Sequence, residues 1–374
     1  FTLEIDAQGD GQWKSWREVA LKAGDASTWV EIPSALPGAW IRAKADRDVA
    51  KASVTFQYAA EDGRANERGT LFKSLSQAGD ASSQGAFLLT RGGNLRTLSV
   101  LAATVTPDQT TVGAAYELSA DLKLTKMADP QVAAFVQKNT PIPQGIVTAD
   151  AASVIFEESG VRWRLPRSPS AAHDGLLGRS ALRKAREVCT ERDMLQAHGT
   201  FYELPALNAK GAIRMRPIAT SDAAVHDYCS YRGLLVLSGV SPEAAKDDRH
   251  VIRSDDGQAA VWVGAADDLW KLGKPRGFGG PWKNTAVQKG TPSDPYLMTG
   301  YDQKTLKLTN HGAKAVRVSV LLDVAGDGRT SAYRTFEVAA GAEITHAFES
   351  WLNAYWVRFV ADEDGVLSAQ LTYE

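Results

Sequence analysis

The sequence lacks both a run of positive charge and a long apolar run. Its 42 Lys and Arg residues are balanced by 44 Asp and Glu residues, for a formal net charge of −2. Nucleic acids and anionic membranes attract clustered cations, so neither is an expected partner. The apolar stretch at 233–240 is far shorter than the roughly 20 residues that cross a bilayer, so no membrane span is expected.

The chain also has few cysteines and does not begin with methionine. Cys189 and Cys229 could form one disulfide or remain free thiols, which leaves the compartment open. The first residues, FTLEID, read as a strand in progress, so we expect a processed or truncated chain. Its 374 residues, 44% of them hydrophobic, suffice for two or three domains with their own cores.

Two segments at the ends of the chain, 1–58 and 318–373, align as copies of one unit. Both alternate apolar and polar residues and place Gly and Asp at the breaks, which predicts small antiparallel β units. A strand-like segment at 304–312 precedes only the second copy, which favours an N-terminal truncation. The aligned positions are Asp6, Gly9, Asp10, Gly11, Gly24, Trp40, Arg42, Asp46 and Asp48 with Asp323, Gly326, Asp327, Gly328, Gly341, Trp356, Arg358, Asp362 and Asp364.

The turns of this unit, rich in Asp and Gly, have two interpretations. Oxygen-rich turns suit calcium, but tight turns also favour Gly and Asp for conformational reasons, and no complete ligand loop is present. We therefore expect no cofactor, with calcium as the alternative at these turns. Trp40 and Trp356 are expected in the cores of their units.

Short strands and one helix-like segment, at 129–140, fill the region between the copies. A hairpin is predicted around Gly160. The Asp-Asp-Gly turn at 255–257, followed by a strand with an inward-facing Trp262, is typical of a propeller blade.

The predicted fold is therefore all-β. A propeller-like central region at 61–303 is flanked by sandwich-like units at 1–60 and 304–374. The alternative is a pair of β-sandwiches around an irregular central β domain.

Polar side chains concentrate in three segments, at 186–205, 226–233 and 271–302. A strand over the first segment would place three acids and a thiol on one face, which makes a poor core, so a site or loop is expected there. A short helix at 180–196 is the alternative. The third segment, rich in Gly and Pro, predicts a long loop over a site.

His198 is the first candidate for a catalytic acid or base. Imidazole titrates near neutrality, and Gly199 permits a turn that would hold this side chain at a strand end. Hydrogen bonding within a loop is the alternative role. The other catalytic candidates are nearby hydroxyl and carboxyl groups: Tyr202, Glu203, Glu191 and Asp193.

Guanidinium forks and aromatic rings are the groups expected to bind a sugar. Arg232 could neutralise the carboxylate of a uronate, and aromatic side chains among charged ones suit sugar rings. Core packing and surface ion pairs are the alternative roles of these residues. The substrate-binding candidates are Arg192, His226, Tyr228, Arg232, Trp270, Lys274, Arg276, Trp282 and Tyr301.

A zinc site is not expected. Cys189, His198, His226 and Cys229 could supply the four ligands of a Cys2His2 set, but their spacing does not form the usual short pairs. A disulfide between the two cysteines is the alternative. A nucleophilic Cys189 matches no cysteine-hydrolase signature.

Several of these motifs together resemble uncharacterised proteins of bacteria that degrade complex polysaccharides. The similarity covers most of 150–374, through REVCTERD, HGTFYELP, HDYCSYRGLLVLSG, DDLWKLGKPRG and SDPYLMTGYD. It implies a periplasmic or extracellular protein with a polysaccharide or oligosaccharide as partner. Similarity to propeller lyases and glycosidases extends only to fold class and residue types.

The leading functional hypothesis is a carbohydrate-active enzyme, either a glycoside hydrolase or a polysaccharide lyase. In both cases the substrate would be a complex polysaccharide, with or without uronates. A hydrolase requires two carboxylates around one glycosidic bond, and a lyase a His or Tyr base with a positive charge on the uronate. The alternative is a non-catalytic glycan-binding or cell-surface scaffold protein.

Overall fold

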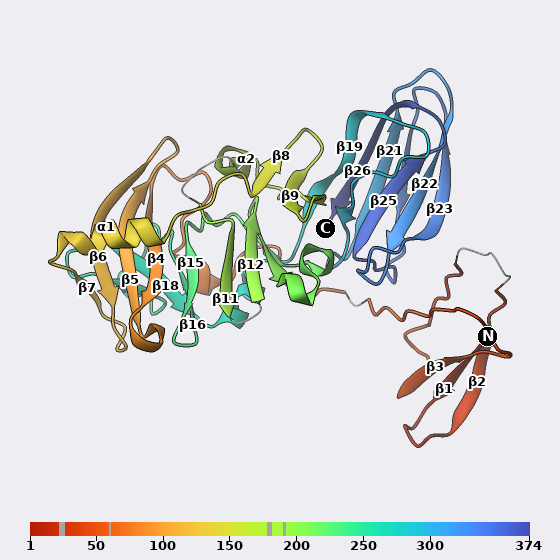
Figure 1. The fold of residues 1–374 in the computed structure, drawn as a ribbon, viewed down its shortest axis with the longest axis horizontal. Helices are drawn as coiled ribbons and strands as arrows, with labels where there is room; N and C mark the ends of the chain where they lie inside the picture. The colour runs from red at the N-terminus through yellow and green to blue at the C-terminus, as the bar shows by residue number, and fades with distance from the viewer. Residues whose placement is uncertain (22–26, 60, 178–181, 190–191) are drawn as a thin grey trace.

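The structure is a computed structural model that describes residues 1–374 except 22–26, 60, 178–181 and 190–191 (Figure 1). For Leu95, Leu177, Cys189 and Arg192 the structure describes the backbone but not the side chain. Strands dominate the described residues, so the predicted all-β class is confirmed.

The described helices are short. Neither α1 (Pro130–Asn139) nor α2 (Ala172–Leu177) is long and apolar enough to span a membrane. The helix predicted at 129–140 is α1, which begins where the Asp129 carboxylate accepts a hydrogen bond from the Gln131 amide. The 3-10 segments are η1 (Thr70–Phe72), η2 (Gly93–Leu95), η3 (Leu207–Ala209), η4 (Gly211–Arg214) and η5 (Ala266–Lys271).

Three four-stranded antiparallel sheets form the central region, as expected of blades. The first contains β4 (Ser83–Arg91), β5 (Thr97–Val105), β6 (Thr110–Leu118) and β7 (Leu124–Lys126). The second contains β15 (Tyr228–Tyr231), β16 (Leu234–Leu237), β18 (Ala260–Gly264) and β17 (Val251–Arg253). The third contains β11 (Ala185–Cys189), β12 (Arg192–Ala197), β13 (Thr200–Pro205) and β14 (Arg216–Thr220).

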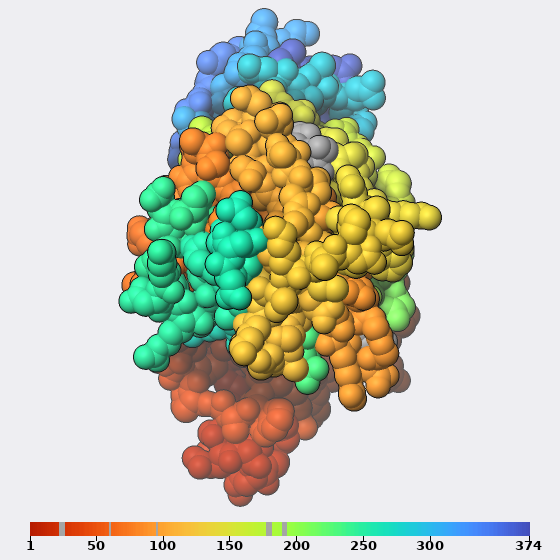
Figure 2. All heavy atoms as spheres, turned by 90° about the vertical axis from the view of Figure 1, so that its left-hand side faces the viewer, coloured from red at the N-terminus to blue at the C-terminus, as the bar shows by residue number. Residues whose placement is uncertain are grey.

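These sheets stack as layers along the long axis of the molecule (Figure 1). One apolar core lies between the β4–β7 and β15–β18 sheets, and a second lies between the β15–β18 and β11–β14 sheets. Helix α1 covers the outer face of the first layer (Figure 1), and yellow atoms lie in front of orange ones on this side of the molecule in Figure 2. The β4–β7 and β15–β18 sheets are therefore covered on both faces.

Two further sheets form the C-terminal sandwich. The order of the first is β23-β22-β25-β20-β10-β9-β8, so it takes in strands from the predicted central region. Its strands are β23 (Ser331–Val338), β22 (Val316–Asp323), β25 (Trp356–Ala361), β20 (Tyr296–Leu297), β10 (Val161–Leu165), β9 (Val154–Glu158) and β8 (Val147–Ala149). The second consists of β19 (Gly277–Val287), β26 (Gly365–Tyr373), β21 (Lys304–Asn310) and β24 (Glu343–Ala347).

Two of the sequence predictions about local structure are wrong. The segment 271–302 is not a long loop, because its middle forms the 11-residue strand β19. The helix considered at 180–196 is not formed over the described residues, since β11 and β12 pair there as antiparallel strands.

At the N-terminus, a small sheet of order β2-β1-β3 comprises β1 (Thr2–Asp6), β2 (Trp13–Glu18) and β3 (Trp40–Lys44). The Asp6 carboxylate accepts hydrogen bonds from the amides of Gly9 and Gly11, both at 2.8 Å. In the C-terminal unit the Asp323 carboxylate accepts one from Gly328, also at 2.8 Å. These turns thus use their carboxylates to bind backbone amides.

The tryptophans of the two units differ in environment. Trp356 is 1% exposed, and its indole N–H donates to the Ile213 carbonyl of η4 at 2.9 Å. Trp40 is 65% exposed, so its predicted place in a core is wrong. The difference arises because the central region packs on Trp356, whereas Trp40 lies at the surface of the small sheet.

A buried carboxylate joins the three central sheets. Asp227 is 0% exposed and accepts hydrogen bonds from the guanidinium groups of Arg183 at 2.8 Å and Arg186 at 2.9 Å. It also accepts from the Leu88 amide of β4 and the Tyr228 amide of β15. The Asp227 side chain thus connects β4, β15, β11 and the segment that precedes β11.

We expect Asp227→Asn to lower the free energy of unfolding by about 3–5 kcal/mol, because two arginines would lose their buried counter-charge. Urea denaturation would measure the change. The control is Asp108→Asn at an exposed turn, which should lie within about 0.5 kcal/mol of wild type. Equal stability of both variants would contradict the role assigned to Asp227.

Candidate functional site

His198 lies at the turn between β12 and β13, as the sequence predicted. It has φ 50° and Gly199 has φ 78°, the left-handed pair of a tight hairpin turn. The imidazole is buried, and its ring centroid lies 5.7 Å from that of His173 on α2. The turn therefore places His198 beside the His173 ring of α2, at one end of the sheet.

Both ring nitrogens of His198 have partners. Nδ1 accepts a hydrogen bond from the Ser168 amide at 2.9 Å, which requires the proton to be on Nε2. Nε2 then donates to the Asp174 carboxylate at 3.0 Å. Asp174 also pairs with Arg167 and keeps 53% of its side chain exposed. The result is a carboxylate–imidazole pair with its carboxylate at the surface.

Burial disfavours the charged form of both imidazoles. It lowers the pKa of His198, and the Asp174 carboxylate offsets only part of that effect. Burial also lowers the pKa of His173 to about 4, although the Ser221 carbonyl accepts its Nε2 proton at 3.0 Å. The hydrogen bond to His198 lowers the pKa of Asp174.

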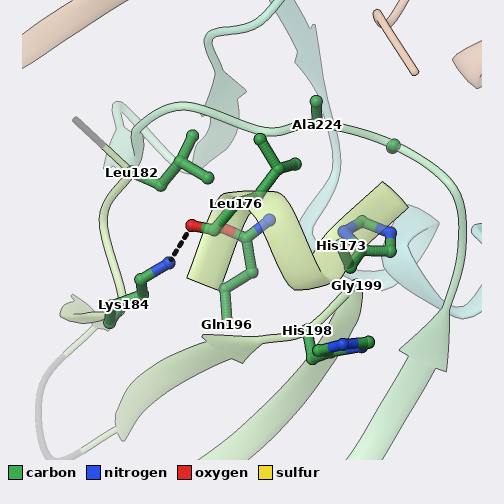
Figure 3. Close-up of a pocket in the computed structure, with 9 residues that line it drawn as sticks. His173, Leu176, Leu182, Lys184, Gln196, His198, Gly199 and Ala224 are labelled. Carbon is green, nitrogen blue, oxygen red and sulfur yellow. Dashed lines mark hydrogen bonds between the residues drawn. The ribbon is translucent and has the colours of Figure 1, made fainter. Parts of the chain in front are cut away.

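The space around these histidines is small. His173, Leu176, Lys184, Gln196 and His198 surround it, and Lys184 donates to the Leu176 carbonyl across it (Figure 3). The centre of a water molecule can reach about 10 Å³ of this cavity. The cavity therefore has room for about one water. A sugar ring does not fit in this cavity.

The other catalytic candidates are not gathered around His198. Tyr202 is fully buried against the sandwich, where burial raises its pKa. Glu203 pairs with Arg216 at 3.0 Å. Asp193 lies opposite Glu187 across the β11–β12 pair, and burial and that carboxylate raise its pKa. Glu191 lies outside the described residues.

Candidates from the second polar segment hold the layers together. The His226 imidazole is 1% exposed and bonds the Ala86 carbonyl at 2.9 Å. The Tyr228 hydroxyl donates to the Met194 carbonyl at 2.8 Å. Cys229 is a buried free thiol whose pKa burial raises to about 12, so the disulfide is not formed. The Arg192 side chain is outside the description.

The third segment mainly supports the fold. Trp282 and Tyr301 are buried in the sandwich core. Lys274 pairs with Asp302 at 2.9 Å, and Arg276 donates to the Asn66 carbonyl. Trp270, just before this segment, has a half-exposed ring, with the Arg64 guanidinium 4.7 Å from its centroid.

Arg232 lies at a second, open site. The β15–β16 turn and the β4–β5 turn lie side by side at the lower end of their strands (Figure 1). Between them is a hollow of about 570 Å³ that is largely open to solvent. The residues that line this hairpin-tip hollow are Thr90, Asn94, Arg96, Ser230 and Arg232.

Sequence reasoning predicted only Arg232 of this set. The Gly-Gly-Asn sequence at 92–94, between two apolar strands, is a turn signal, but it does not show which segment lies beside the turn. The link is the Tyr231 hydroxyl, which donates to the Arg96 carbonyl at 2.8 Å and so joins turns 135 residues apart.

In the part of the chain that the structure describes, no group of three or more His, Cys, Asp or Glu residues could hold a metal ion. His198 and His226, two of the four zinc-type residues, bond protein groups instead.

No protein-family model matches the sequence, and no curated protein matches it. Among solved structures, a GH32 β-fructofuranosidase of Bombyx mori covers 79% of this chain with 80% of its own, at 9% identity and a TM-score of 0.19. An exo-β-1,3-galactanase of Phanerochaete chrysosporium covers 80% with 100% of its own, at 9% identity and 0.18. A GH43 arabinoxylan arabinofuranohydrolase of Bacillus subtilis covers 83% with 98%, at 10% and 0.17. TM-scores this low do not establish a shared fold.

Stability should fall as the pH drops from about 6.5 towards 4. Unfolded imidazoles bind protons near pH 6.5, whereas His173 in the folded chain does so only near pH 4. Its contribution is therefore fully present above pH 6.5 and amounts to about 3 kcal/mol. Urea denaturation between pH 7.5 and 4.5 would measure the slope, which His173→Gln should reduce. A flat profile for the wild type would contradict the assignment.

Gly199→Ala should destabilise the chain more than Gly233→Ala. Both glycines have positive φ, at 78° and 82°, and a side chain there costs about 1–2 kcal/mol. At Gly199 the new Cβ would also contact the His173 ring and lie 2.7 Å from the Ser221 carbonyl, whereas at Gly233 it meets nothing within 4 Å. Thermal unfolding of both variants tests this, and we expect a further loss of about 1–3 kcal/mol at Gly199. A smaller loss at Gly199 would mean that the histidine pair is loosely packed.

Proposed function

We propose that the chain is a carbohydrate-binding protein, located in the periplasm or outside the cell, whose glycan site is the hairpin-tip hollow. The observation that carries the proposal is the chemistry of the lining. Every residue there has a hydroxyl, amide or guanidinium group, and the hollow is open to solvent.

This lining suits a polyhydroxylated ligand. A sugar offers several hydroxyls that both donate and accept, and the hydroxyls of Thr90 and Ser230 do the same. The Asn94 amide adds two donors and an acceptor. Ser230 and Asn94 are exposed, so a ligand can reach them without rearrangement of the core.

A second candidate function is the enzyme hypothesis, a glycoside hydrolase or polysaccharide lyase. The Asp174–His198 pair favours it, since a half-exposed carboxylate next to an imidazole is a common acid–base arrangement. Turnover there would require His198 to exchange a present partner for a substrate, because both its nitrogens are bonded.

A combined binding and product screen tests the two candidates. The purified chain is incubated with plant, algal and microbial polysaccharides, binding is measured by calorimetry, and released sugars are analysed by mass spectrometry. We expect binding without products. Ser230→Ala and Asn94→Ala should each weaken binding about threefold to tenfold, because each removes a hydrogen bond.

Ser350→Ala, at an exposed position of the C-terminal unit, is the matched control and should bind like wild type. Products with an added water, or with unsaturated uronate ends, that disappear in His198→Asn would establish the enzyme instead. Neither binding nor products with any polysaccharide would exclude both candidates.

A further inference from the structure

Two arginines of the hairpin-tip hollow have no counter-charge among the described residues. Arg96 and Arg232 are exposed, and neither side chain forms an ion pair or hydrogen bond with another described residue. Arg91, at the start of the same turn, contrasts with them, since it pairs with Glu117 at 3.1 Å and donates to Ser99 at 2.5 Å. Carboxylates are thus placed beside Arg91 but not inside the hollow.

The backbone around both arginines is fixed. The Tyr231 hydroxyl, which is buried, donates to the carbonyls of Arg96 and Leu118 at 2.8 and 3.1 Å. Arg232 itself has φ 52°, the left-handed conformation of a tight turn. The hydrogen bond from Tyr231 to the Arg96 carbonyl therefore joins the two backbone turns that carry these arginines at the rim of one hollow.

Two like charges at one hollow create a local positive potential in a chain of net charge −2. A guanidinium presents parallel N–H groups that match the oxygens of a carboxylate or sulfate. An oxyanion between the two forks would remove their repulsion and receive charge-assisted hydrogen bonds. The hydroxyls of Thr90 and Ser230 would then contact neutral parts of the same ligand.

We propose that the hairpin-tip hollow binds an acidic polysaccharide and receives its anionic group, a uronate carboxylate or a sulfate ester, between Arg96 and Arg232. This inference rests on the proposed function and specifies the ligand class of the same site. A nucleic acid fits less well, because the lining has two cations and no line of further cations to follow a phosphate backbone.

Calorimetry of the whole chain with three oligosaccharides of matched length tests the inference: an oligogalacturonate, a sulfated galactan fragment and a neutral xylan fragment. We expect at least one acidic ligand to bind at least tenfold more tightly than the neutral one, with an affinity that falls as salt rises. Arg96→Gln and Arg232→Gln should each reduce that affinity about tenfold or more. The control Arg249→Gln removes an exposed arginine from the β16–β17 loop and should have no effect.

The outcomes separate this inference from the proposed function. Tight binding of the oligogalacturonate alone assigns a carboxylate, and tight binding of the sulfated fragment alone assigns a sulfate ester. If the neutral fragment binds equally well and the Gln variants change nothing, the anionic ligand is excluded while glycan binding stands. If none of the three binds and polysaccharides also fail, the proposed function is lost as well.

Discussion

The buried carboxylate of Asp227 is the constraint on which the layered fold depends. An ionised side chain with no exposure is tolerated only if hydrogen bonds surround it, and two guanidiniums and two amides do so. Because these donors come from different sheets, satisfying the charge requires the layers to meet in one register. Apolar packing between sheets would permit sliding, whereas these directed bonds select one arrangement.

The same logic explains why polar residues concentrate in segments that look like an active site. A sheet covered on both faces must bury alternate side chains on each side, as Phe201 and Tyr202 do on β13. Backbone groups at its ends then lie away from water and need internal partners, which His198, His226 and Tyr228 provide. Polar density in this chain therefore indicates where layers join.

Local patterns predicted local structure well. The helix at 129–140, the Gly160 hairpin and the buried Trp262 all depend on residues close in sequence. What the sequence could not provide was the environment created by distant segments. Arg232 was a predicted ligand residue, but Arg96 joins it only through a hydrogen bond across 135 residues. No alternation or turn signal carries that information.

The terminal units show how far a motif can be independent of its surroundings. Each closes its own turn with its own carboxylate, Asp6 or Asp323, although one unit packs on the central region through a tryptophan and the other exposes it. Neither turn depends on a neighbour for its amides. A turn closed in this way keeps its conformation whether the tryptophan of its unit is buried, as Trp356 is, or exposed, as Trp40 is.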